Sequence, residues 1–153
     1  MKHIFTILSV LLITTVASAQ SSKQVKWAYA VKKVADKTYE VHMTATINNG
    51  WHLYAQEVGV EGPLPTVFTF TKNPLLTVDG KVKENGKLIK KKESVWGGDG
   101  MVNYYEKSVE FVQVVKVKGN VKTNLTGKVE FIVCNDKECL PPAEVEINVN
   151  IGG

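Results

Sequence analysis

Short runs of alternating apolar and polar residues follow one another along most of the chain. In residues 39–47 every second side chain is apolar, from Tyr39 to Ile47, and polar side chains stand between them. A period of two is typical of a strand with one face in a core and the other in water. Similar runs occupy residues 25–31, 66–71, 76–82, 108–117, 125–133 and 145–151.

Turn-forming residues separate these runs. Asparagine, aspartate, glycine or proline stands in the breaks at residues 35–37, 48–50, 73–74 and 118–120. No segment shows sustained helical periodicity. About eight short strands with frequent turns predict an all-β domain, and specifically an immunoglobulin-like antiparallel β-sandwich.

The first residues have the pattern of an export signal. A basic head at residues 1–3 is followed by an apolar run at 4–16 and by Ala17-Ser18-Ala19, a small-x-small cleavage motif. The apolar run is too short to form a membrane-spanning helix. We therefore expect a signal peptide at residues 1–19, one domain at 20–153, a periplasmic or secreted protein, and no stable membrane insertion after cleavage.

Charge limits the classes of partner. The formal net charge of +4 at pH 7 is a small surplus, and we expect no nucleic-acid partner. Residues 81–92 nevertheless contain six lysines. Two interpretations stay open: a solvated edge strand, where lysines discourage edge-to-edge pairing, or a docking surface for an acidic partner.

Both cysteines of the chain lie near its end, in Cys134-Asn135-Asp136-Lys137-Glu138-Cys139-Leu140-Pro141-Pro142. The flanking runs read as strands, and if they pair as a hairpin the two cysteines can face each other at its neck. Cross-strand Cα separations there are roughly 4.5–5.5 Å, within the usual disulfide range of about 4.4–6.8 Å. The two prolines cannot continue a ladder and should hold Cys139 near a surface.

Such a disulfide could be a reversible redox pair or a structural staple. A loop of about six residues gains only roughly 2 kcal/mol from closure, so the bridge can open without unfolding the domain. The spacing is not Cys-x-x-Cys, and Lys137 stands between two carboxylates. These features favour a carrier that a more reactive partner attacks, but an exported protein-binding module with a purely structural disulfide stays open.

Two motifs together resemble a known family. The segment Cys134-x4-Cys139-Leu140-Pro141-Pro142, at the end of an exported β-domain, resembles the N-terminal periplasmic domain of the thiol:disulfide interchange protein DsbD. The segment Asn49-Gly50-Trp51-His52-Leu53-Tyr54 resembles that domain's Gly-aromatic-aromatic-Leu-Tyr sequence. The similarity extends from about Trp27 to Ile151.

The resemblance implies an immunoglobulin-like fold whose cysteine pair exchanges electrons with periplasmic thioredoxin-like proteins. Cys139 would form the mixed disulfide with a partner, and Cys134 would resolve it. His52 and Tyr54 would line the site, and a cap loop near residues 95–100, which includes Trp96, would shield the cysteines. The best-known members also carry a membrane electron conduit, so we expect the membrane electron donor of this chain on a separate chain.

The sequence departs from the family at two points. The best-known members have one more residue between the cysteines, and His52 replaces a family tyrosine. His52 is isolated, so we expect no metal site and no cofactor. A third hypothesis is a β-domain that binds a ligand or chaperones a partner through Trp51, Tyr54 and Trp96.

Overall fold

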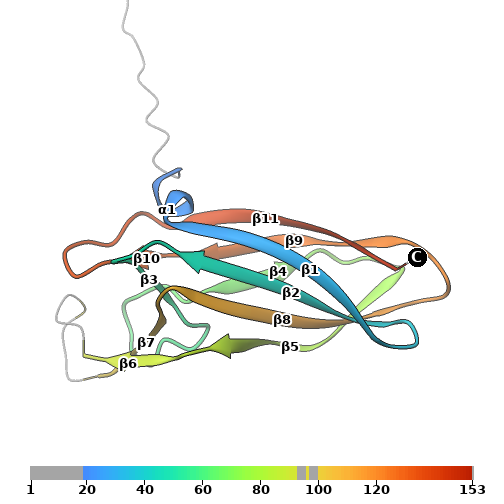
Figure 1. Cartoon of the computed structure of the whole chain (residues 1–153), viewed down its shortest axis with the longest axis horizontal. Helices are drawn as coiled ribbons and strands as arrows, with labels where there is room; N and C mark the ends of the chain where they lie inside the picture. The colour runs from blue at the N-terminus through green and yellow to red at the C-terminus, as the bar shows by residue number, and fades with distance from the viewer. Residues whose placement is uncertain (1–18, 93–95, 97–99, 153) are drawn as a thin grey trace, which may run out of the picture.

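The computed structural model describes residues 19–92, 96 and 100–152 (Figure 1). The expected signal peptide therefore lies almost entirely outside the described residues. Within them, one short helix is followed by eleven strands, which are α1 (Ala19–Gln24), β1 (Val25–Ala35), β2 (Thr38–Ile47), β3 (His52–Tyr54), β4 (Val67–Phe70), β5 (Leu76–Gly86), β6 (Ile89–Lys91), β7 (Val102–Tyr105), β8 (Ser108–Val117), β9 (Thr123–Phe131), β10 (Val133–Cys134) and β11 (Ala143–Ile151).

The strands form three sheets, and all the strand pairs are antiparallel. Sheet A has the order β1-β2-β8-β5, sheet B the order β10-β3-β7-β6, and sheet C the order β11-β9-β4. Sheet B lies at one end of the molecule, beside the left ends of the longer strands in Figure 1. Because β7 leads into β8, and β9 into β10, sheet B is a continuation of both longer sheets.

The main core lies between sheets A and C. In β2 the predicted alternation is confirmed, because Val41, Met43, Ala45 and Ile47 are buried while the residues between them are not. From β9 and β11, Leu125, Val129, Phe131, Ile147 and Ile151 are buried opposite them. This burial confirms the expected all-β sandwich of antiparallel sheets.

Two features differ from the expected elements. The predicted strand at 125–133 is broken at Ile132, because β9 ends at Phe131 in sheet C and β10 begins at Val133 in sheet B. The helix α1 was not predicted, since its six residues are too few to show a helical period. The count of about eight strands was also low, because the strands of sheet B have only two to four residues each.

The lysine run at 81–92 falls on strands β5 and β6, each of which is the last strand of its sheet. The expected edge position of this run is therefore confirmed, and both interpretations of its lysines are consistent with that position. Among the described residues, no helix is long and apolar enough to cross a membrane.

Candidate functional site

The two cysteines form a disulfide at the neck of a hairpin. Cys134 and Cys139 are joined with an S–S distance of 1.98 Å and a Cα–Cα distance of 4.0 Å. On either side of them, Leu140 N donates to Val133 O (3.0 Å) and Asn135 N donates to Glu138 O (2.9 Å). The cysteines thus occupy a non-hydrogen-bonded pair between two bonded ones, the position where antiparallel strands approach most closely. Their Cα separation of 4.0 Å is shorter than the roughly 4.5–5.5 Å expected from the sequence.

Asn135 shapes the tip of this hairpin. Its side-chain oxygen accepts hydrogen bonds from the backbone nitrogens of Lys137 and Glu138, each at 2.8 Å. An asparagine side chain that mimics a backbone turn in this way favours a tight reversal. The tip projects into solvent, with the Asp136 side chain 92 % exposed.

The two sulfur-bearing residues differ in exposure. Cys134 is fully buried, whereas Cys139 is partly exposed. Cys139 is followed by the buried Leu140 and then by two exposed prolines. This agrees with the expectation that the prolines hold Cys139 near a surface.

Sheet B separates the main core from a second, smaller apolar cluster. On β3, Leu53 packs into the main core, while Tyr54 packs into the second cluster. On β10, Val133 packs into the main core and Cys134 packs into the second cluster. Because side chains alternate between the two faces of these short strands, the row of side chains on one face of sheet B lies beside the disulfide.

His52 lies directly across from Cys134. The two residues are Cα partners in the antiparallel pairing of β3 with β10, so their side chains share one face of sheet B. His52 is buried, with 5 % of its surface exposed, and its ring lies against that of Tyr104 (centroids 4.3 Å apart, interplanar angle 30°). The imidazole is thus fixed beside the disulfide by an aromatic neighbour.

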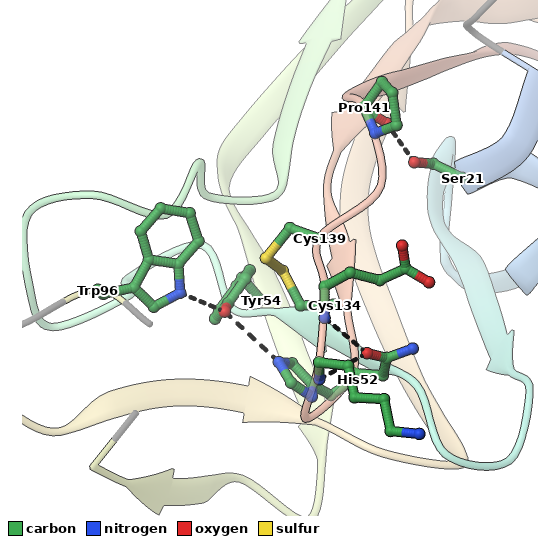
Figure 2. Close-up of a disulfide and its surroundings, with 10 residues drawn as sticks. Ser21, His52, Tyr54, Trp96, Cys134, Cys139 and Pro141 are labelled. Atoms are coloured by element: carbon green, nitrogen blue, oxygen red, sulfur yellow. Dashed lines mark hydrogen bonds between the residues drawn. A yellow bond between two sulfur atoms is a disulfide. The ribbon is translucent and has the colours of Figure 1, made fainter. Parts of the chain in front are cut away.

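The hydroxyl of Tyr54 connects two other rings of the site (Figure 2). Trp96 Nε1 donates a hydrogen bond to it at 2.7 Å, and His52 Nε2 lies 3.4 Å from it. Tyr54 is itself fully buried, and its backbone oxygen accepts a 2.6 Å hydrogen bond from Thr66 Oγ1. These bonds fix Tyr54 from both its backbone and its side chain.

Trp96 covers the second cluster from outside sheet B. It is half-buried and packs on the cluster that includes Tyr54, Cys134 and Cys139. A Cβ atom added to Gly62 would lie 2.9 Å from the Trp96 ring, and Gly62 has a φ of +129° that other residues rarely adopt. Glycine at position 62 therefore lets the loop and the indole approach each other.

A comparison with protein families decides where the chain belongs. The family model of the N-terminal domain of the thiol:disulfide interchange protein DsbD matches residues 19–151. The chain belongs to this DsbD N-terminal domain family. Among curated proteins, none matches the chain.

Two solved structures share the family fold. The N-terminal domain of DsbD from Neisseria meningitidis, in its reduced form, has a TM-score of 0.55 and 19% identity, over 86% of this chain and 89% of that one. The N-terminal periplasmic domain of ScsB from Proteus mirabilis has a TM-score of 0.60 and 16% identity over 82% of this chain. The chain covers only 46% of the ScsB chain. These likenesses confirm the immunoglobulin-like fold expected from the sequence.

The residues that the DsbD resemblance singled out come together in the structure. The disulfide, His52, Tyr54 and Trp96 all border the second cluster. Of the suggested cap loop, residues 95 and 97–99 lie outside the described residues. Trp51, in contrast, packs against the main core, whereas Tyr54 and Trp96 belong to the second cluster.

Sequence reasoning missed several residues of this DsbD-like site. Tyr104, Val58 and Ile132 belong to the second cluster, and no motif in the sequence identified them. Ser21 is another: it is fully buried, and its hydroxyl donates to the backbone oxygen of Pro141 (Figure 2). Nothing in the local sequence signals a contact between residues 120 positions apart.

Among the described residues, no group of three or more histidines, cysteines, aspartates or glutamates is arranged to hold a metal ion.

Proposed function

We propose that this chain is an exported thiol–disulfide relay domain whose Cys134–Cys139 pair exchanges electrons with thioredoxin-like proteins. The observation that carries the proposal is the unequal exposure of the two cysteines within one short hairpin. Cys139 is partly exposed toward a partner and Cys134 is enclosed, which gives the two positions different roles. Membership of the DsbD N-terminal family supports the same chemistry.

The exchange is a pair of thiol–disulfide displacements. A partner thiolate attacks the sulfur of Cys139, a bond forms between them, and the Cys134–Cys139 bond breaks. The bonding electron pair leaves with the Cys134 sulfur, which takes up a proton. The partner's second thiol then attacks the mixed disulfide and releases the Cys139 thiolate, which is also protonated. Two electrons and two protons have moved from the partner to this chain, and the reverse sequence passes them on.

The aromatic residues form the walls of this site in the proposal. His52, Tyr54 and Trp96 surround the pair, so a partner contacts Cys139 beside them rather than through the buried Cys134. The donor is a membrane electron carrier, the recipients are thioredoxin-like proteins, and the exchange takes place in the periplasm. The similar ScsB domain from Proteus mirabilis is periplasmic, which supports that location.

The first test is the redox potential of the pair, measured in glutathione or dithiothreitol buffers by thiol alkylation and mass spectrometry. We expect a potential between roughly −120 and −270 mV, the range of exchangeable thioredoxin-like proteins. A potential below about −300 mV, or unfolding on reduction, would establish a structural staple instead.

A second test separates the roles of the two cysteines. Cys134→Ser should accumulate a mixed disulfide with a thioredoxin-like protein whose second cysteine is replaced by serine and whose first cysteine carries a small-thiol leaving group. Cys139 remains accessible and displaces that group, and neither protein keeps a thiol that can resolve the complex. The matched variant Cys139→Ser should accumulate little, since Cys134 is enclosed. Equal trapping by both variants, detected on non-reducing gels, would contradict the assignment.

A further inference from the structure

Six lysines crowd onto the edge strands that lead to the disulfide end. We call Lys81, Lys83, Lys87, Lys90, Lys91 and Lys92 the lysine edge; all six are exposed and follow β5 and β6. The whole chain has 19 basic residues, so nearly a third of them stand within twelve positions. A concentration of this kind creates a local positive potential that the net charge of +4 does not reveal.

The positive charge of four of these lysines, Lys81, Lys83, Lys87 and Lys90, is little compensated by carboxylates among the described residues. Glu84 is the one acidic residue of the segment, and its carboxylate accepts hydrogen bonds from Gln56 N and Tyr105 Oη, both at 2.7 Å. The Glu84 carboxylate is therefore directed toward the protein rather than toward the solvent that surrounds the lysines. Among the described residues, no ion pair involves Lys81, Lys83, Lys87 or Lys90.

The lysine edge reaches the disulfide hairpin. Lys91 Nζ lies 3.8 Å from Asp136 Oδ1, at the tip of that hairpin. Asp136 is three positions before Cys139, which is at most about 11 Å of backbone. A standard protein interface covers about 800 Å² on each side, a disc with a radius of about 16 Å. A protein that touches the sulfur of Cys139 therefore also covers Lys91 and the ends of its neighbours.

Apolar side chains are interspersed with these lysines. Leu88 is 41% exposed and Met101 is 46% exposed. Leu88 lies between Lys87 and β6, and Met101 precedes Val102, the strand partner of Lys91. Exposed apolar residues inside a charged rim are typical of docking surfaces rather than of plain solvated edges.

We infer that the lysine edge is a docking surface for an acidic face around the redox cysteines of a thioredoxin-like partner. The inference rests on the proposed function and adds the charge of the partner that this site accepts. Opposite charge beside the exchanging sulfurs steers the encounter and orients the partner's thiolate toward Cys139. A lysine edge that serves only to block pairing between sheet edges would leave the exchange rate independent of partner charge.

The test varies charge on both proteins. The probe is a reduced thioredoxin domain made in two surface forms, with four glutamates or four lysines around its Cys-x-x-Cys motif; dithiothreitol serves as an uncharged reductant. Each of these three reductants is mixed with three forms of this chain: the wild type, the variant Lys87→Glu/Lys90→Glu, and the control variant Lys118→Glu/Lys122→Glu. The control changes the net charge equally, but its exposed lysines follow β8 at the opposite end of the sandwich (Figure 1). Rates are measured by stopped flow at low and high salt.

We expect the glutamate form to reduce the wild type at least about 10-fold faster than the lysine form at low salt, with the difference shrinking at high salt. Lys87→Glu/Lys90→Glu should reverse this order, the control variant should keep it, and dithiothreitol should reduce all three alike. Equal rates with both forms, or the same loss in the control, would overturn the docking surface and leave the relay standing. Failure of both forms to reduce any variant, at any salt, would overturn the relay and its docking surface together.

Discussion

At the scale of single residues, the hydroxyl of Tyr54 holds the outer wall of the site in place. It accepts the hydrogen bond of Trp96 Nε1, and Trp96 otherwise rests on the cluster through its ring. A hydrogen bond of this kind contributes about 1 kcal/mol net. Loss of this hydrogen bond would therefore increase, by roughly fivefold, the fraction of molecules in which the indole is displaced.

We predict that Trp96→Ala increases the rate at which dithiothreitol reduces the disulfide by several-fold, because the ring no longer shields the cluster. Trp96→Phe keeps an aromatic ring but removes the N–H donor, so its rate should lie between those of Trp96→Ala and the wild type. The rates can be followed by quenched alkylation and mass spectrometry. A rate in Trp96→Ala equal to that of the wild type would mean that the indole does not shield the sulfurs.

A second residue-scale prediction concerns alkaline pH. Burial, reinforced by the hydrogen bond and the negative charge of Glu84, raises the pKa of Tyr105 above its ordinary value of 10.0. The folded protein thus retains this proton after the unfolded chain has lost it. The corresponding stability is complete below pH 10 and declines as the pH rises above it.

The wild type should accordingly lose stability more steeply than Tyr105→Phe between about pH 9 and about pH 11. At neutral pH the variant should have the lower melting temperature, since it lacks the bond to Glu84. The melting temperatures of the two proteins should therefore converge as the pH rises. Thermal unfolding by circular dichroism measures both proteins. Parallel pH profiles would show that Tyr105 does not contribute to this dependence.

At the scale of elements, the sequence predicted the long strands and missed the sheet that carries the site. Residues 108–117 were expected as a strand and form β8 with those bounds. In contrast, β3, β6, β7 and β10 have two to four residues, which is too few to display a period of two. Sheet B forms because these short strands pair with one another in space, and such pairing is not apparent in any one segment of the sequence.

The candidate site was predictable only in part for the same reason. The cysteine spacing and the aromatic segment identified Cys134, Cys139, His52 and Tyr54, because these residues are close in sequence within each motif. Tyr104 reaches the site only through the pairing of β7 with β3. Ser21 reaches it through the packing of α1 against β11. Contacts of this kind depend on the assembled fold.

The contact of Ser21 leads to a prediction about α1. Its hydroxyl donates to Pro141 O, two residues beyond Cys139, and the side chain is fully buried. Ser21→Ala would leave this acceptor without its donor at a cost of about 1–2 kcal/mol, a fall in melting temperature of roughly 3–6 °C. Lys23→Ala, on the exposed side of α1, is the control and should change stability by less than about 0.5 kcal/mol. Similar melting temperatures for the two variants would refute a stabilising role for the Ser21 contact.

At the scale of the whole molecule, the exchange chemistry and the main core occupy different parts of the sandwich. The buried residues of sheets A and C form one large cluster, while the disulfide belongs to a smaller cluster on the other face of sheet B. The hairpin that carries the cysteines is closed independently by nine residue pairs between β9 and β11. The domain therefore does not depend on the disulfide to bring these strands together.

We predict that removing the disulfide costs at most about 2 kcal/mol, because it closes a loop of only a few residues whose ends are already paired. Cys134→Ala/Cys139→Ala should keep the native circular dichroism spectrum and unfold cooperatively in urea. Met43→Ala, which leaves a cavity in the main core, is the benchmark and should cost about 2–5 kcal/mol. The same urea curves with the reduced wild type test the bridge without a mutation. If reduction unfolds the protein, or destabilises it more than Met43→Ala does, the disulfide holds the fold together and cannot cycle as a relay requires.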